Sequence, residues 1–145
     1  MPAAAADLLI VEDSRADAHM AMKVLFKRHI AERIEWAHDG RAALDYLFHE
    51  GEYADREPGN PRLIVLDINM PGLNGLQVLE RVRLHPLTKH VPVVLFSTSD
   101  SSADIRMGYE RGANSYLNKP IDPTDYVELL ATVGAYWLRQ NRTPD

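Results

Sequence analysis

Short apolar runs alternate with amphipathic stretches along the whole chain. Residues 8–11 (LLIV) and 63–66 (LIVL) are continuous apolar runs, as expected of strands that are buried on both faces of a sheet. Further strands are predicted at 33–37, 91–96 and 115–118. In the stretches between them, apolar residues recur at the spacing of one helical face, and turn-forming residues mark the ends.

Five helices are predicted between and after these strands. Ser14 can cap the first helix, and its apolar face would be formed by Ala18, Ala21, Met22, Leu25 and His29. The other helices are expected at 40–50, 76–84, 102–111 and 123–140. Residues 51–61 contain two prolines and two glycines without periodicity, which predicts a polar surface loop.

The order of these elements is a strand–helix unit repeated five times. Single helices between strands imply right-handed crossovers and a parallel sheet. A chain of 145 residues has the size of one domain, and no repeat or linker divides it. We therefore expect an α/β fold with one domain over residues 1–145, a core at about 7–140 and no output domain.

Polar residues follow four of the five predicted strands. Glu12 and Asp13 follow the first strand, Asp67 the third, Ser97 the fourth and Lys119 the fifth. In a parallel α/β sheet these carboxyl ends form the functional edge. Crowded carboxylates repel one another unless a cation joins them, and hard oxygen ligands suit Mg²⁺. Lys119 would place a positive charge, and Ser97 a hydroxyl donor, beside a phosphoryl group. The pattern predicts phosphoryl transfer to a carboxylate.

Each of these residues also has an ordinary structural interpretation. Glu12 and Asp13 could complement the dipole of the first helix, and Asp67 could be a solvated acid at a strand end. Residues 97–102 could be a polar run that caps a helix, and Lys119 could be a solvated surface lysine. The functional interpretation depends on all of them meeting at one edge of the sheet.

Composition narrows the functional classes. Sixteen basic against 21 acidic residues give a net charge of −5, which disfavours nucleic-acid binding through phosphate contacts. Cysteine is absent, so disulfides, thiolate catalysis and zinc–thiolate sites are excluded. The first apolar run stops after four residues at an acid, too short for a signal peptide or a membrane span. We expect a soluble, cytoplasmic protein.

Four motifs together resemble the receiver domain of two-component response regulators. They are IVED (10–13), LIVLDINMPGLNG (63–75), VPVVLFSTS (91–99) and GANSYLNKP (112–120), and they span nearly the whole chain in the family's order and spacing. The resemblance implies a flavodoxin-like fold. Its five-stranded parallel sheet would have the order 2-1-3-4-5, with helices on both faces.

The resemblance also implies how the acidic residues act. Asp67 would be the phosphoacceptor, which takes the phosphoryl group from the phosphohistidine of a histidine kinase. Asp13 would bind Mg²⁺ directly and Glu12 through water. Asp67 itself and the backbone carbonyl of Asn69 would complete the protein's metal ligands.

Other positions would contact the phosphoryl group or respond to it. By resemblance, Lys119 would bind it, Ser97 would move toward it, and the ring of Tyr116 would swing inward with Ser97. The bond between Lys119 and Pro120 resembles the cis peptide of the family. Thr98 is bulkier than the alanine or glycine frequent in the family. We expect it to restrict the attacking water and to slow any autophosphatase reaction.

Output is expected to pass through protein contact. By resemblance, phosphorylation would shift a population between two states through the surface of helix 4, strand 5 and helix 5, where a homodimer could form. The C-terminal residues Tyr136, Trp137 and Leu138 are a second candidate interface. The loop at 51–61 and the C-terminal aromatic–tryptophan pair resemble stand-alone receivers associated with phytochrome kinases. Trp36, on a predicted edge strand, is either a half-buried strand residue or a further contact.

Two other functions fit parts of the pattern. A haloacid-dehalogenase-like phosphatase also uses a strand-end aspartate, Mg²⁺, a hydroxyl and a lysine. Such enzymes carry an Asp-x-Asp motif that begins with the nucleophile, whereas the corresponding residues of this chain are Asp67, Ile68 and Asn69. A receiver-like module that binds its partner independently of phosphorylation would need none of the site residues. We therefore expect a phosphoacceptor rather than an enzyme.

Overall fold

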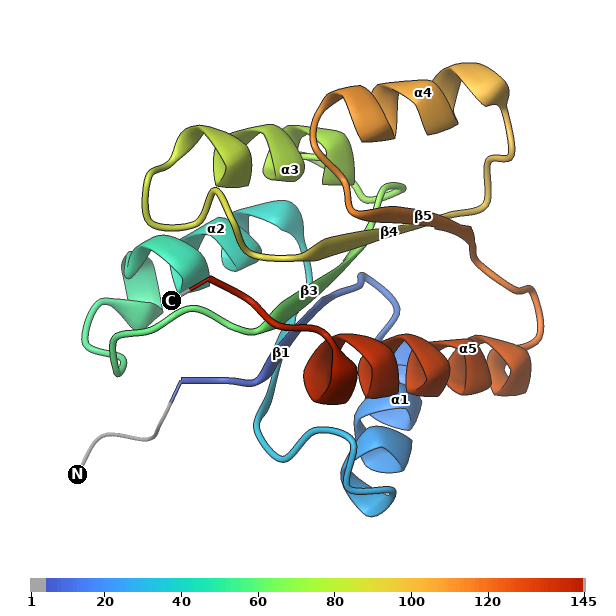
Figure 1. The fold of residues 1–145 in the computed structure, drawn as a ribbon, viewed down its shortest axis with the longest axis horizontal. Helices are drawn as coiled ribbons and strands as arrows, with labels where there is room; N and C mark the ends of the chain where they lie inside the picture. Colours follow the sequence, from blue (N-terminus) through green and yellow to red (C-terminus); the bar gives the residue numbers. More distant parts are fainter. Residues whose placement is uncertain (1–4, 145) are drawn as a thin grey trace.

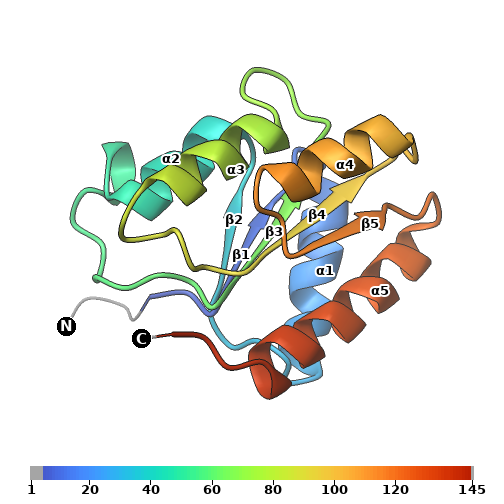
Figure 2. The ribbon, with the colours of Figure 1, turned by 45° about the horizontal axis from the view of Figure 1, so that its top comes forward.

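The computed structural model describes residues 5–144. Their strands form one five-stranded sheet. Every strand pairing is parallel, and the order is β2-β1-β3-β4-β5 (Figure 2). The strands are β1 (Leu8–Val11), β2 (Ile34–Ala37), β3 (Leu63–Asp67), β4 (Val93–Ser97) and β5 (Ser115–Asn118). The expected fold class and strand order are both confirmed.

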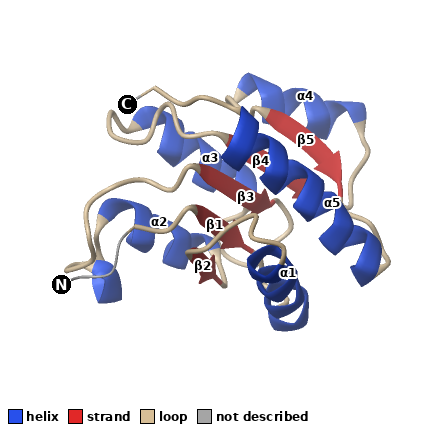
Figure 3. Cartoon of the chain, turned by 60° about the horizontal axis from the view of Figure 1, so that its bottom comes forward, coloured by secondary structure: helices blue, strands red, loops and turns tan. Residues whose placement is uncertain are grey.

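Helices cover both faces of the sheet. Helices α1 and α5 lie on one face and α2, α3 and α4 on the other (Figure 1), and Figure 3 shows α1 and α5 from their own side. Their bounds are α1 (Arg15–Lys27), α2 (Gly40–Phe48), α3 (Gly75–Leu84), α4 (Ser102–Glu110) and α5 (Pro123–Ala135). None of the helices in residues 5–144 is both long enough and apolar enough to cross a membrane.

The three central strands are buried along their whole length. Successive side chains of a strand point to opposite faces, so Leu9 and Val11 join the core with α2 and α3, whereas Leu8 and Ile10 join the core with α1 and α5. Burial on both faces explains the continuous apolar runs of the sequence. It also makes β1, β3 and β4 a fixed platform for the residues at their ends.

Side-chain caps set where the helices begin after the strands. The hydroxyl of Ser14 accepts the backbone N–H of Asp17 at the start of α1. At the start of α3, Asn74 and Gln77 form a reciprocal capping box. These caps satisfy backbone donors that would otherwise lack partners, and they fix the turns between the sheet edge and the helices.

Two helices end earlier than the apolar spacing predicts. Helix α1 ends at Lys27, and His29 is exposed with a left-handed φ of 57°, so its place on the apolar helical face was wrong. Helix α2 ends at Phe48, because His49 also has a φ of 57°. A left-handed residue ends the helical hydrogen-bond pattern, whatever the periodicity of the residues that follow.

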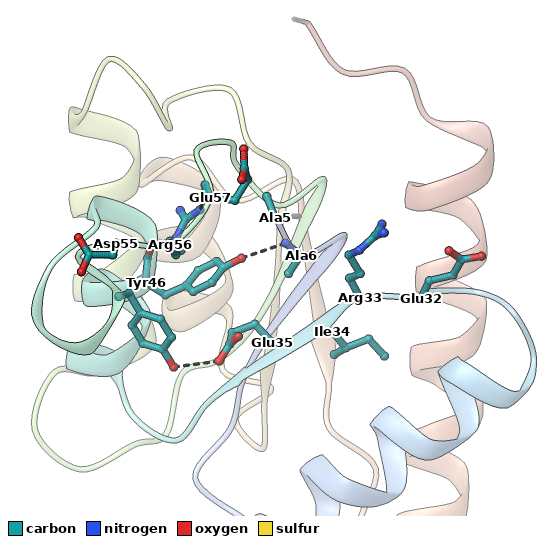
Figure 4. Close-up of a pocket in the computed structure, with 11 residues that line it drawn as sticks. Ala5, Ala6, Glu32, Arg33, Ile34, Glu35, Tyr46, Asp55, Arg56 and Glu57 are labelled. Carbon is teal, nitrogen blue, oxygen red and sulfur yellow. Dashed lines mark hydrogen bonds between the residues drawn. The ribbon is translucent and has the colours of Figure 1, made fainter. Parts of the chain in front are cut away.

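The segment 51–61 is partly packed rather than wholly exposed. It begins with a 3₁₀ helix (Gly51–Tyr53), and the ring of Tyr53 meets that of Tyr46 edge to face at 5.2 Å. The guanidinium of Arg56 lies 4.1 Å from the centre of the Tyr46 ring. These side chains line a hollow of about 520 Å³, in which the Tyr46 hydroxyl accepts the N–H of Ala6 at 3.0 Å (Figure 4).

The C-terminal helix changes its geometry near its end. The α-helical part of α5 ends at Ala135, and a π-helical turn (Tyr136–Gln140) follows directly. Tyr136 is 54% exposed and Trp137 is half-buried, but Leu138 is only 5% exposed and belongs to the core. The expectation that Leu138 forms an interface was therefore wrong. The wider π turn shifts the register of the face that meets the sheet.

Candidate functional site

Four strand ends meet at the carboxyl edge of the sheet. Asp67 and Ser97 are the last residues of β3 and β4, while Glu12 and Lys119 directly follow β1 and β5. Glu12, Asp67 and Ser97 are 1%, 6% and 1% exposed, whereas Asp13 is exposed. The structure thus brings together the polar residues that the sequence places at separate strand exits.

The ammonium group of Lys119 lies at the centre of this edge. It donates a hydrogen bond to Oε1 of Glu12 and lies 3.3 Å from Oδ2 of Asp67. A third carboxylate, that of Asp17, is 3.4 Å away. Burial by itself would lower the pKa of Lys119, but the hydrogen bond to Glu12 and the nearby carboxylates raise it. Lys119 therefore stays charged.

The two buried carboxylates are only partly compensated by this ammonium. Burial raises the pKa of Asp67, although Lys119 and the backbone N–H of Asn69 act in the opposite direction. Burial likewise raises the pKa of Glu12, against the effects of Lys119 and the backbone N–H of Ser14. The negative charge of Asp67 also raises the pKa of Glu12, and that of Asp13 raises the pKa of Asp67. Further positive charge would therefore be favourable here.

The acidic residues fit a divalent cation. Glu12, Asp13 and Asp67 each offer one carboxylate oxygen, and these oxygens lie within 4.8 Å of one another. Mg²⁺ takes hard oxygen ligands, commonly one or two carboxylates with waters. The predicted further ligand, Asn69, is held beside this group because its N–H donates to Oδ1 of Asp67 at 3.0 Å. This donor set could hold a divalent cation.

The turn after β3 keeps Asp67 at the edge and leaves room for α3. A Cβ atom on Gly75 would lie 2.6 Å from the carbonyl oxygen of Asp67 and 2.8 Å from Cα of Ile68, closer than packing allows. Gly72 has a positive φ of 73°, a backbone conformation that side chains disfavour. Both glycines of the LIVLDINMPGLNG motif thus have a physical reason.

The residues after β4 and β5 are connected by hydrogen bonds. The hydroxyl of Ser97 donates to Oδ1 of Asn69 at 3.1 Å, and the exposed Thr98 hydroxyl is 3.5 Å from the same oxygen. Ser97 also accepts the N–H of Ser99 at 3.0 Å. The half-buried Tyr116 donates its hydroxyl to the carbonyl of Ser99 at 2.8 Å. Tyr116 is therefore linked to Ser97 through Ser99.

The peptide bond before Pro120 differs from the expectation. No peptide bond among the described residues is cis, so the bond between Lys119 and Pro120 is trans and the predicted cis peptide was wrong. A trans bond before proline is lower in free energy by about 0.5–1 kcal/mol. In this form the N–H of Lys119 donates to the carbonyl of Ser97 at 2.8 Å.

Two residues of the site were not predicted. Asp17 lies in the first turn of α1, directly after the acidic pair and its cap, and this position could have indicated it. Tyr126 of α5 places its hydroxyl 3.4 Å from Oε1 of Glu12, and its ring centre is 5.0 Å from Nζ of Lys119. In the sequence, Tyr126 precedes the apolar Leu129 and Leu130 by three and four residues, as a core residue of a helix would. Only the packing of α5 shows that its hydroxyl reaches the acidic group.

Sequence comparisons identify the family. Residues 8–131 match the response regulator receiver domain. The probable methanogenesis regulatory protein FilR2 of Methanothrix harundinacea is 38% identical over 138 residues, covering 94% of this chain and 86% of that protein. Response regulator Rcp1 of Synechocystis sp. is 34% identical over 137 residues, covering 94% of this chain and 92% of that protein.

Solved structures agree with this assignment. The Mn²⁺-bound form of response regulator Rcp1 matches with a TM-score of 0.85 and 33% identity, covering 95% of this chain and 98% of that one. The phosphorylated cyanobacterial phytochrome response regulator RcpA matches with a TM-score of 0.88 and 31% identity, covering 98% and 100%.

The fold, the acidic edge and these matches define a signalling domain of two-component systems. The chain belongs to the response regulator receiver family. Within that family it is related to phytochrome response regulators, which confirms the resemblance seen in the sequence.

The charge balance of the site predicts the effect of replacing Lys119 with methionine. Loss of the ammonium leaves Glu12 and Asp67 buried without their counter-charge, so Lys119→Met should lower the free energy of unfolding by about 3 kcal/mol near neutral pH without metal. The folded-state pKa values of both carboxyls are raised, so the folded form gains stability as they take up protons. The loss should therefore shrink as the pH falls and the two carboxyls become protonated.

Urea unfolding with a metal chelator, at neutral and mildly acidic pH, measures this effect. Lys89→Met, a change at an exposed lysine, is the matched control and should alter stability by less than about 0.5 kcal/mol. A Lys119→Met protein as stable as the control at neutral pH would contradict the proposed charge balance.

Proposed function

We propose that this protein is a response regulator that accepts a phosphoryl group on Asp67 from a histidine kinase, with Mg²⁺ bound by the acidic residues. One observation carries the proposal. The Asp67 carboxylate lies at the end of β3, with Lys119 Nζ at 3.3 Å and carboxylate oxygens of Glu12 and Asp13 within 4.8 Å. A nucleophile, a cation site and a phosphate-binding ammonium thus share one edge.

The proposed reaction is a direct transfer between two side chains. One carboxylate oxygen of Asp67 forms a bond to phosphorus, while the bond between phosphorus and the donor imidazole nitrogen breaks. The imidazole leaves with the electron pair of that bond. Bound Mg²⁺ would supply positive charge to the acidic edge and to the phosphoryl oxygens. Lys119 would hold the phosphoryl group from the other side.

Phosphorylation would change the hydrogen bonds of the switch residues. The added group carries roughly −1.5 to −2 charges and three acceptor oxygens. Ser97, whose hydroxyl now donates to Asn69, can turn its donor toward these oxygens. Its bond with Ser99 would change as well, and with it the contact from the Tyr116 hydroxyl. This sequence of contacts leads toward the surface of α4, β5 and α5.

Incubation with a small-molecule phosphodonor tests the acceptor role directly. We expect intact mass spectrometry to show a gain of one phosphoryl group that depends on Mg²⁺. Asp67→Asn should abolish the gain, because an amide oxygen is a poor nucleophile and cannot form the acyl phosphate.

The control is Asp55→Asn, a change at an exposed aspartate in the 51–61 segment, which should leave the mass gain intact. A folded wild-type protein that gains no phosphoryl group would favour a module that binds its partner without phosphorylation. A gain that survives in Asp67→Asn would place the acceptor elsewhere.

Thr98 is proposed to slow the loss of the phosphoryl group. Its exposed side chain lies beside Asn69, where a water approaching Asp67 would pass. Thr98→Ala should shorten the lifetime of the phosphorylated form by roughly two- to tenfold, which corresponds to at most about 1.4 kcal/mol of barrier. Decay of the phosphorylated mass after donor removal measures it. An unchanged lifetime would contradict the role.

The output surface is proposed to be the face of α4, β5 and α5, as a homodimer interface. Ile121, between β5 and α5, is 100% exposed, and Met107 and Tyr109 of α4 are also exposed. Exposed apolar side chains on these elements favour association. Phosphodonor treatment should increase the dimeric fraction in sedimentation analysis, and Ile121→Glu should reduce that increase. An equal increase in the dimeric fraction for the wild type and Ile121→Glu would exclude this face. Tyr136 and Trp137 would extend the contact.

The donor is proposed to be a phytochrome-type histidine kinase in the cytoplasm. Support comes from the relatedness to Rcp1 and to the phytochrome response regulator RcpA over nearly the full chain. A packed 51–61 segment and the edge-to-face pair of Tyr136 and Trp137 are the local features behind the same proposal.

A further inference from the structure

The indole of Trp36 reaches from the edge strand to the start of the acidic pair. Its Nε1–H donates to the backbone carbonyl of Glu12 at 2.7 Å. The backbone N–H of Glu12 donates to the carbonyl of Ala37 at 3.0 Å. Both backbone groups of Glu12 are therefore bound to β2 residues, one by the ordinary sheet pattern and the other by a side chain.

This indole bond continues the sheet past its last backbone pair. Val11 and Ala37 are the final register partners of β1 and β2, and beyond them the chain leaves the sheet toward α1. The bound carbonyl belongs to the planar peptide that joins Glu12 to Asp13, so holding it fixes the plane of that peptide. This peptide contains the backbone nitrogen of Asp13, so its orientation sets the direction in which the Asp13 side chain leaves the backbone.

The indole is itself held in place. Its ring meets that of His19 edge to face at 5.4 Å and that of His38 at 6.4 Å. The guanidinium of Arg15 lies 6.0 Å from the ring centre. These three neighbours restrict rotation of the half-buried ring, so its N–H keeps pointing at the Glu12 carbonyl. A positioning group must be restrained in this way.

We propose that Trp36 is a positioning residue for metal binding: its indole N–H orients the Glu12–Asp13 peptide so that the carboxylates converge with Asp67. The inference rests on the Mg²⁺ site of the proposed function and assigns a new residue to it. Trp36 touches neither the metal position nor the phosphoacceptor and acts only through the backbone of Glu12.

Two substitutions separate the donor from the bulk of the ring. Trp36→Phe keeps an aromatic ring and removes the N–H. Trp36→His keeps an N–H at the equivalent position of a five-membered ring and removes the rest, and its imidazole is neutral at about pH 8. We expect calorimetric titration to show a Kd for Mg²⁺ that is about tenfold higher in Trp36→Phe and nearer the wild-type value in Trp36→His.

Trp137→Phe is the matched control, because it removes the other tryptophan of the chain, far along the sequence in the C-terminal turn. Its Kd for Mg²⁺ should equal that of the wild type. In this variant Trp36 is the only tryptophan, so its fluorescence should change as Mg²⁺ saturates the site. Melting without metal shows whether either change at Trp36 merely unfolds the protein.

The outcomes distinguish this inference from the proposed function. If the wild type binds no Mg²⁺, the proposed metal site and the role of Trp36 both fail. If the wild type binds and Trp36→Phe binds equally well, only the role of Trp36 fails. Equal weakening in Trp36→Phe and Trp36→His, or a lower melting temperature with an unchanged Kd, would assign Trp36 a packing role and overturn the inference.

Discussion

A single ammonium group lies among three carboxylates at the carboxyl edge of the sheet, and the site depends on this unequal charge balance. Lys119 contacts Glu12, Asp67 and Asp17 from one position. Because Glu12 and Asp67 are buried, their pKa values remain raised despite that contact. The edge therefore favours an additional cation, and under the proposed function the same ammonium would bind the phosphoryl group.

This unfavourable concentration of charge is tolerated because the strands beneath it are strongly fixed. β1, β3 and β4 are buried along their whole length, between a core with α1 and α5 and a core with α2 and α3. Burial of apolar area provides the free energy that offsets the desolvated acids. Gly75, which has no side chain, allows the start of α3 to approach the backbone of Asp67 closely.

A continuous series of hydrogen bonds connects this edge to the surface of β5. Asn69 donates its N–H to Asp67, and its side-chain oxygen accepts from Ser97. Ser97 accepts from Ser99, whose carbonyl accepts from Tyr116. Under the proposed function, Ser97 would turn toward the phosphoryl group, and the other bonds of the series would then change. On the opposite side, the indole of Trp36 ties Glu12 to the edge strand β2. Hydrogen bonds therefore link the buried carboxylates to both edge strands: Glu12 to β2 through Trp36, and Asp67 to β5 through the series that ends at Tyr116.

The sequence by itself determined the strand–helix alternation, the order of polar residues at the strand exits and the family, because apolar period and motif spacing are local properties of the chain. It did not determine that α1 ends before His29, that the bond before Pro120 is trans, or that the π turn buries Leu138. The trans bond is the ordinary state of an X-Pro peptide, whereas packing decides the left-handed backbone at His29 and the helix register near Leu138. Tyr126 and Trp36 belong to the same class. Each looks like a core or strand residue in the sequence, and only the assembled sheet and helices bring its polar atom to Glu12.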